Sequence, residues 1–212
     1  MLSKLLVTGI ALFATAAALP PAISWYSLDQ LARFDNAEGL PLVAASPIGI
    51  YLDIFWQGMS LVQTGGLQNV AIVEPNSPPN YAAFSAADVA TLTQGQPAMT
   101  VNYADSTIDH FSLHSFYYGC SAATQASVAG VPLSCTVTIK GYADDQAQQL
   151  VASQSFDFKA GLLQTSAQQL RADVSSKFKN LKRVNFFVSN NVLTAGLIDT
   201  VSYTVYSDRS FA

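Results

Sequence analysis

Residues 108–142, IDHFSLHSFYYGCSAATQASVAGVPLSCTVTIKGY, decide the fold that the sequence predicts. Apolar and polar residues alternate over DHFSLHSFYYG and again over SCTVTIKGY, which is typical of two β-strands. A loop rich in Ser, Ala and Gly separates the two stretches, and the only two cysteines, Cys120 and Cys135, stand at its mouth. We therefore predict a β-hairpin closed by a disulfide, as expected in an exported chain.

Similar alternation recurs on both sides of this hairpin. Strands are expected at residues 50–57, 70–73, 99–103, 150–159, 183–189 and 198–207. Residues 23–36 are compatible with a strand or a single helical turn, and residues 161–180 with an amphipathic helix or, slightly favoured, a crossing loop with one helical turn. Many short strands separated by turns predict an all-β fold, a single antiparallel jelly-roll sandwich with one or two short helices.

The first residues predict export from the cell. Lys4 precedes an apolar run over residues 5–18 that ends in three alanines. This pattern indicates a signal peptide, residues 1–18, cleaved after Ala18. At about 1.5 Å per helical residue the run covers roughly 21 Å, short of the roughly 30 Å hydrocarbon layer, which disfavours an anchor. Residues 19–212 are expected to form one secreted, extracellular domain.

Composition narrows the possible partners. The chain loses Lys4 from its 10 basic residues on cleavage and so carries 9 against 14 acidic ones, a formal charge of −5. This balance argues against nucleic acid and against anionic membranes as partners. The one local charge run holds Lys177, Lys179, Lys182 and Arg183. A solvated turn is its commoner explanation, with contact to an anionic polymer as the alternative.

Several stretches carry a family resemblance. They are RFDNAEGLP, PIGIYLDIFWQGMSLV, EPNSPPNYAAF, STIDHFSLHSFYYGC and FKNLKRVNFFVSNN. With them the chain resembles a group of secreted fungal proteins that have a galactose-binding-like jelly-roll sandwich. The resemblance implies that fold, and relatives with it often bind carbohydrate. Some hold a structural calcium where the first and last strands meet; Asp35 and Asp199 stand at corresponding places, but no dense carboxylate loop surrounds them.

Signals for catalysis are weak in this sequence. His110 and His114 would lie about 13 Å apart on a strand, too far for one metal ion. No G-x-S-x-G pentapeptide occurs, and the only glutamates, Glu38 and Glu74, fall in predicted loops. We therefore expect a protein that is not an enzyme and needs no cofactor, and a glycan-active enzyme with a dispersed active site remains as an alternative.

Aromatic residues offer the remaining hypothesis for function. They could form a platform that stacks on sugar rings while nearby amides fix its orientation. The candidate ligand-binding residues are Trp56, Tyr81, Asn80, Tyr117 and Tyr118, with Asn76 and Gln57 in support. For each aromatic side chain taken alone, a place in the core is the favoured interpretation. The sequence thus favours binding of a glycan or cell-wall polysaccharide, and the alternative is an effector that binds a host or partner protein.

Overall fold

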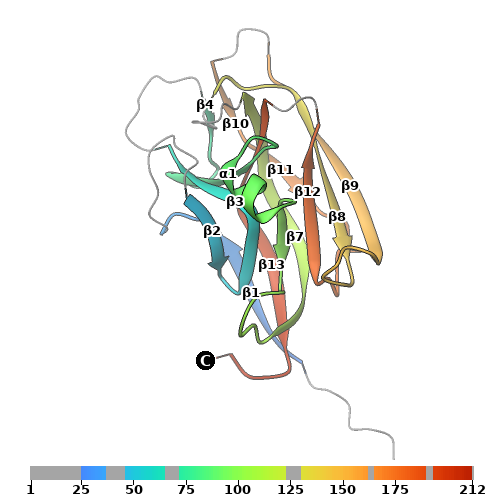
Figure 1. Ribbon diagram of the computed structural model, residues 1–212. Helices are drawn as coiled ribbons and strands as arrows, with labels where there is room; N and C mark the ends of the chain where they lie inside the picture. The colour runs from blue at the N-terminus through green and yellow to red at the C-terminus, as the bar shows by residue number, and fades with distance from the viewer. Residues whose placement is uncertain are drawn as a thin grey trace, which may run out of the picture.

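A computed structural model describes residues 25–36, 46–64, 72–122, 130–161, 165–189 and 193–211 (Figure 1). The predicted signal peptide lies outside these residues and stays a prediction. No helix within the described ranges is long and apolar enough to cross a membrane.

Strands make up nearly all of the regular structure, and one short helix accompanies them. The strands are β1 (Tyr26–Ala32), β2 (Ser46–Tyr51), β3 (Ile54–Gln63), β4 (Ile72–Glu74), β5 (Asn80–Phe84), β6 (Ala98–Thr100), β7 (Ile108–Ala122), β8 (Cys135–Tyr142), β9 (Leu150–Phe158), β10 (Ser166–Gln168), β11 (Leu170–Asp173), β12 (Arg183–Val188) and β13 (Thr194–Ser207). The helix is α1 (Val89–Gln94). The predicted all-β fold with a short helix is confirmed.

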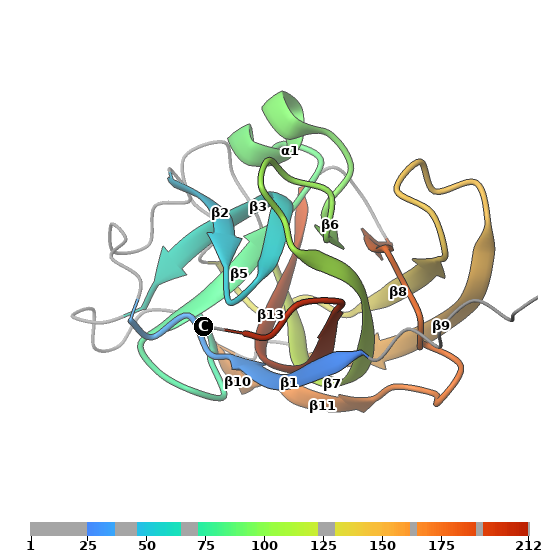
Figure 2. The same cartoon turned by 90° about the horizontal axis from the view of Figure 1, so that it is seen from below.

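One long antiparallel sheet curls into two layers. Its strand order is β11-β7-β13-β5-β3-β6-β12-β8-β9, with β1 paired to β13 and β2 paired to β3. Figure 2 shows β1, β7, β11 and β13 along one side of the molecule. Strand β5 pairs with both β13 and β3, so it joins this layer to the other. A separate parallel pair, β4 with β10, lies apart from the main sheet.

The core lies between the two layers. The rings of Trp56 on β3 and Tyr203 on β13 have centroids 6.3 Å apart, and those of Phe116 on β7 and Phe186 on β12 are 5.8 Å apart. All four side chains are buried. Because each pair joins strands of opposite layers, these aromatic contacts hold the sandwich closed.

The predicted hairpin is wrong in its pairing, although both of its strands exist. Strand β7 pairs with β13 and β11, whereas β8 pairs with β12 and β9. The disulfide is confirmed, and Cys120 and Cys135 have Cα atoms 6.2 Å apart. The bond therefore ties two strands that share no ladder, although a short antiparallel bridge between Ser121 and Pro132 lies beside it at the mouth of the loop.

Residues 50–57 do not form a single strand as the alternation suggested. The chain turns at Leu52 and Asp53, which have φ of 49° and 63°, and β2 runs back along β3. Positive φ at both central residues is characteristic of a type I′ hairpin turn, for which Gly or Asn is the usual signal. The turn residues Leu52 and Asp53 include neither Gly nor Asn, so the turn could not be recognised from the sequence.

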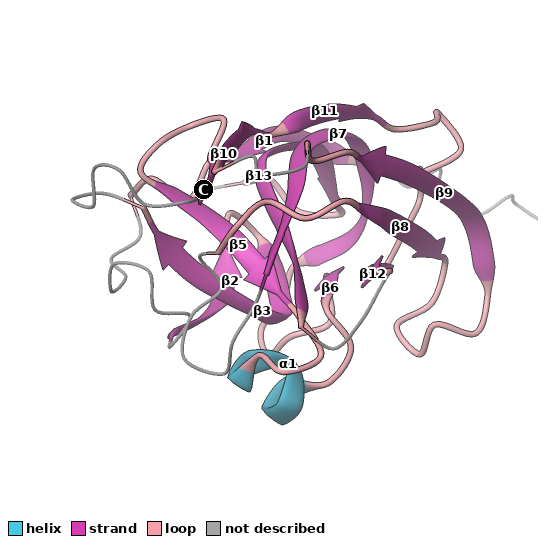
Figure 3. Cartoon of the chain, turned by 90° about the horizontal axis from the view of Figure 1, so that it is seen from above, coloured by secondary structure: helices cyan, strands magenta, loops and turns pink. Residues whose placement is uncertain are grey.

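In residues 161 and 165–180, which the structure describes, there is neither a long helix nor a loop without strands. Their described part holds β10 and β11, which add to β4 and β7. Figure 3 shows the helix α1 at one side of the strands. It sits against β3, where the Thr91 hydroxyl donates to the Gly58 carbonyl over 2.8 Å.

Candidate functional site

The predicted aromatic platform is not on the surface. Trp56 is 0% exposed, and its indole Nε1 donates to the Tyr51 carbonyl over 3.1 Å. Phe34 packs edge-on against it with ring centroids 4.9 Å apart. The prediction that Trp56 stacks on a ligand is therefore wrong for this structure, because its indole is enclosed by the core.

Tyr81 and Asn80 on β5 are enclosed as well. Tyr81 is 0% exposed, and burial raises the pKa of its phenol well above the ordinary value. The Asn80 amide donates from Nδ2 to the Phe34 carbonyl over 2.7 Å. Asn80 thus fixes the chain after β1 instead of facing a ligand.

The two neighbouring tyrosines of β7 point to opposite faces of the strand. Tyr118 is 4% exposed, donates its hydroxyl to the Asp157 carbonyl over 2.9 Å, and packs among core rings. Tyr117 is partly exposed. Of the five predicted binding residues only Tyr117 reaches the surface, so the structure does not bring them together as a binding face.

A different aromatic group is exposed, where β1 and β7 begin and β13 ends. The register pairs Tyr26 with Ser207 and Ser207 with Ile108, so three strand ends meet at one edge. Two pockets of ≈450 Å³ each open there and share Trp25 and Asp109. We call them together the Trp25 groove, lined by Trp25, Asp105, Ser106, Thr107, Ile108, Asp109, His110, Asn180, Lys182, Tyr206, Asp208 and Arg209.

Stacked rings form the floor of this groove. His110 and Tyr206 are direct cross-strand partners, and their rings lie 4.5 Å apart with an interplanar angle of 11°. Trp25 meets the His110 ring edge-on with centroids 5.2 Å apart, and it is 41% exposed. Contact with the imidazole orients the indole while leaving part of it open to solvent.

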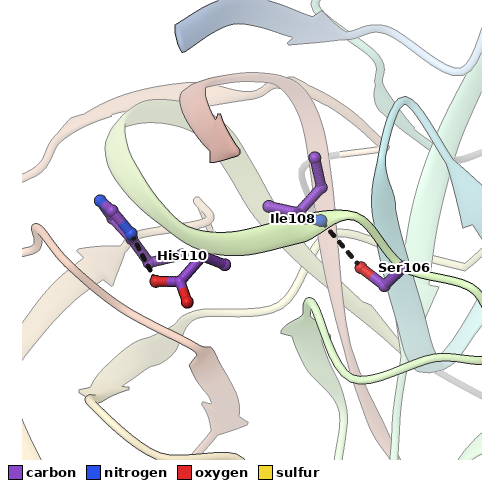
Figure 4. Close-up of polar contacts among 4 residues, drawn as sticks. Ser106, Ile108 and His110 are labelled. Carbon is purple, nitrogen blue, oxygen red and sulfur yellow. Dashed lines mark hydrogen bonds and ion pairs between the residues drawn. The ribbon is translucent and has the colours of Figure 1, made fainter. Parts of the chain in front are cut away.

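Hydrogen bonds at the start of β7 fix the polar side of the groove. Figure 4 shows His110 and, beside it, the turn in which the Ile108 N–H donates to the Ser106 hydroxyl over 3.3 Å. Asp109 Oδ2 lies 2.9 Å from His110 Nδ1. This carboxylate holds the imidazole ring that stacks on Tyr206.

A polar row crosses the same outer face, next to the groove. The Thr204 hydroxyl donates to Asp29 Oδ1 over 2.6 Å and lies 2.8 Å from His114 Nε2. Because a hydroxyl has one proton, Thr204 accepts from His114, whose Nε2 must carry hydrogen. The exposed His114 is thereby tied to β13 and β1.

Asp35 and Asp199 do come together, as the resemblance implied. Ser77 joins them, since its N–H donates to Asp199 Oδ2 over 2.6 Å and its hydroxyl to Asp35 Oδ2 over 2.5 Å. Asp199 is 0% exposed, and burial, with a contribution from Asp35, raises its pKa to about 7. The raised pKa means that this carboxyl group holds a proton far more readily than an exposed aspartate does.

This pair does not fit a calcium site. Calcium takes six to eight oxygen ligands, but both Asp199 oxygens already accept backbone N–H groups, from Ser77 and Thr200. Asp35 Oδ1 is the one buried carboxylate oxygen here without a hydrogen-bond partner in the described part of the chain. No cluster of three or more His, Cys, Asp or Glu able to hold a metal occurs in the described residues.

Comparisons with known proteins add information about the fold. No family model and no curated protein matches the chain. A DUF4465 family protein from Bacteroides caccae is similar in structure with a TM-score of 0.46 and 12% identity, over 83% of this chain and 98% of that one. A Stig cyclase from Fischerella sp. TAU, solved in complex with a pyrrolidinylidene indole, has a TM-score of 0.33 and 12% identity, over 86% and 85%.

The second of these structures corrects the expectation that the protein is not an enzyme. That structure is of an enzyme. Independently of it, the lack of a familiar hydrolase motif is no ground for excluding catalysis. The correction goes no further, because likenesses at these TM-scores assign neither a reaction nor a ligand to this chain. The class that the fold defines is an all-β sandwich with one disulfide.

Proposed function

We propose that the protein is secreted and binds a glycan in the Trp25 groove. The observation that carries the proposal is the exposed indole of Trp25, held edge-on by His110, which in turn stacks on Tyr206. A sugar ring presents an apolar face that packs well on an indole, and hydroxyl groups around it need polar partners. The Trp25 groove supplies both an indole face and polar side chains.

Other features support this proposal. The buried disulfide is of the kind that forms in oxidising compartments, which agrees with export of the chain. The resemblance to secreted fungal proteins with a galactose-binding-like sandwich points to the same ligand class. Binding to a host or partner protein is the alternative, and no feature of the Trp25 groove favours it over a glycan.

A glycan array followed by titration calorimetry tests the proposal. Trp25→Ala should weaken binding of any retained glycan by about twofold to tenfold, because a stacked aromatic contributes about 0.5 to 1.5 kcal/mol. Tyr26→Ala is the matched control, since Tyr26 is adjacent, is 51% exposed and does not line the groove.

Fluorescence gives a second readout of the same site. The chain has two tryptophans, and Trp56 is fully buried. In a Trp56→Phe background Trp25 is the only tryptophan, and its emission should shift to shorter wavelength when a glycan covers it. A folded protein that retains no glycan, or one whose binding survives Trp25→Ala unchanged, would falsify the proposal.

A further inference from the structure

The two pockets of the Trp25 groove differ in charge: Asp109 lines both, and only one of them also holds a lysine. Lys182 and Asn180 line the pocket that also holds His110 and Tyr206. Beyond Trp25, the second pocket is lined by Asp105 and Asp208 together with Arg209. A ligand that crosses Trp25 therefore meets a cation on one side and mainly carboxylates on the other.

Lys182 is partly exposed and, with the exposed Lys177 and Lys179, forms a group that we call the lysine rim. Lys177, Lys179 and Lys182 lie on the segment that leads from β11 into β12, beside the start of β7. In the described part of the chain none of these lysines is within 4.0 Å of a carboxylate oxygen. Their charges are not neutralised by close ion pairs.

Arg183 does not belong to this rim, although it is next in sequence. Its guanidinium donates to Asn185 Oδ1 over 2.6 Å and to Gln57 Oε1 over 3.0 Å. Burial lowers its pKa. The basic run seen in the sequence is thus divided: the Arg183 guanidinium is held by polar side chains of the sandwich, whereas Lys177 and Lys179 are exposed and Lys182 is partly exposed.

Asp109 lines the same pocket as Lys182 but is already engaged. Its Oδ2 contacts His110 Nδ1 at 2.9 Å, and this contact positions the stacked ring. The Lys182 ammonium is then the charged group in this pocket that has no close ion-pair partner among the described residues. An anionic substituent on a bound sugar would complete it with a charge-assisted hydrogen bond.

We infer that the ligand of the Trp25 groove is an acidic glycan, with a carboxylate or sulfate group placed over Lys182. The inference rests on the proposed function and names the ligand class of that site. The acidic pocket beyond Trp25 repels a second anion, so the sugar that lies there is uncharged. Because the mature chain has a formal charge of −5 after loss of Lys4, general attraction of polyanions cannot replace this local contact.

Two matched probes test the inference by calorimetry. One is an oligosaccharide of alternating glucuronate and N-acetylglucosamine, and the other is the same oligosaccharide with its carboxylates reduced to alcohols. We expect the wild-type protein to bind the acidic probe more tightly. Lys182→Gln should weaken the acidic probe about fivefold to tenfold and leave the reduced probe within about twofold.

Lys159→Gln serves as the control, because Lys159 is exposed and lines a separate pocket beside Cys135. Equal affinity for the two probes, with Lys182→Gln affecting neither or both alike, overturns the acidic ligand while the glycan site stands. No binding of either probe, or of any neutral glycan on the array, overturns the site itself. If Trp25→Ala leaves binding of the acidic probe unchanged, the probe binds outside the groove, and this result contradicts both the glycan site and its acidic ligand class.

Discussion

Replacing Asp199 should remove a large part of the pH dependence of stability. Asp199 is fully buried on β13, and burial raises its pKa from 3.8 to about 7. In the unfolded chain the group loses its proton near pH 4, whereas in the folded protein it keeps the proton to about pH 7. Between these pH values the folded state holds more protons, so stability falls as pH rises.

The size of the effect follows from the two pKa values. The contribution of Asp199 to the free energy of unfolding should fall by about 2 to 3 kcal/mol between pH 5 and pH 8, most of it below pH 7. Above pH 7 the slope ends, because the carboxyl group is ionised in both states. Asn at this position has a similar shape and cannot ionise, so its contribution is the same at every pH.

Urea unfolding at pH 5, 6, 7 and 8 measures this difference. The stability of the wild-type protein relative to Asp199→Asn should shrink by about 2 to 3 kcal/mol over the range, whatever the variant loses in hydrogen bonding at the Ser77 and Thr200 N–H groups. Asp173→Asn is the control, since that side chain is 80% exposed. A difference that stays constant within about 0.5 kcal/mol would refute the buried, proton-holding carboxyl group.

Two further predictions concern the sandwich itself. A methyl group at Gly58 would lie 2.4 Å from the Gly95 carbonyl oxygen at a φ of 65°. Gly58→Ala should therefore lower the free energy of unfolding, measured in urea, by about 3 kcal/mol or more. Gly49 has a similar φ but open space around it, so Gly49→Ala should lower that free energy by about 1 kcal/mol. Equal costs would contradict the close approach. Reducing the bond between Cys120 and Cys135, which closes a loop with a separation of 15, should lower stability by about 3 kcal/mol, and a loss below about 1 would contradict its role as a cross-link.

Strand positions could be predicted from the sequence, but strand partners could not. The alternation in residues 108–118 marks β7 correctly, because a strand with one buried face needs a period of two. Nothing local in that stretch shows that β13 and β11 flank it, since pairing depends on how the whole chain returns. The short strands β10 and β11 illustrate the same limit, because they are held by β4 and β7 and not by their own periodicity.

The binding face could not be predicted because burial of an aromatic residue is a tertiary property. Trp56 lies in residues 50–57, where both alternating faces carry aromatic residues, so the sequence alone does not show which face is enclosed. Trp25 lies in a segment compatible with a strand or a helical turn. Its contact with His110, which in turn stacks on Tyr206, exists only because three distant strand ends meet at one edge.

The position of β1 separates the proposed binding site from the buried carboxyl pair. Trp25 precedes β1, Asp35 follows it, and β1 has 7 residues. At about 3.3 Å per residue the two ends of the strand are more than roughly 20 Å apart. A change at Trp25 is therefore too far away to disturb the contacts that Ser77 makes with Asp35 and Asp199. Loss of glycan binding in Trp25→Ala, with the pH profile of stability unchanged, would accordingly report on the groove and not on a loosened sandwich.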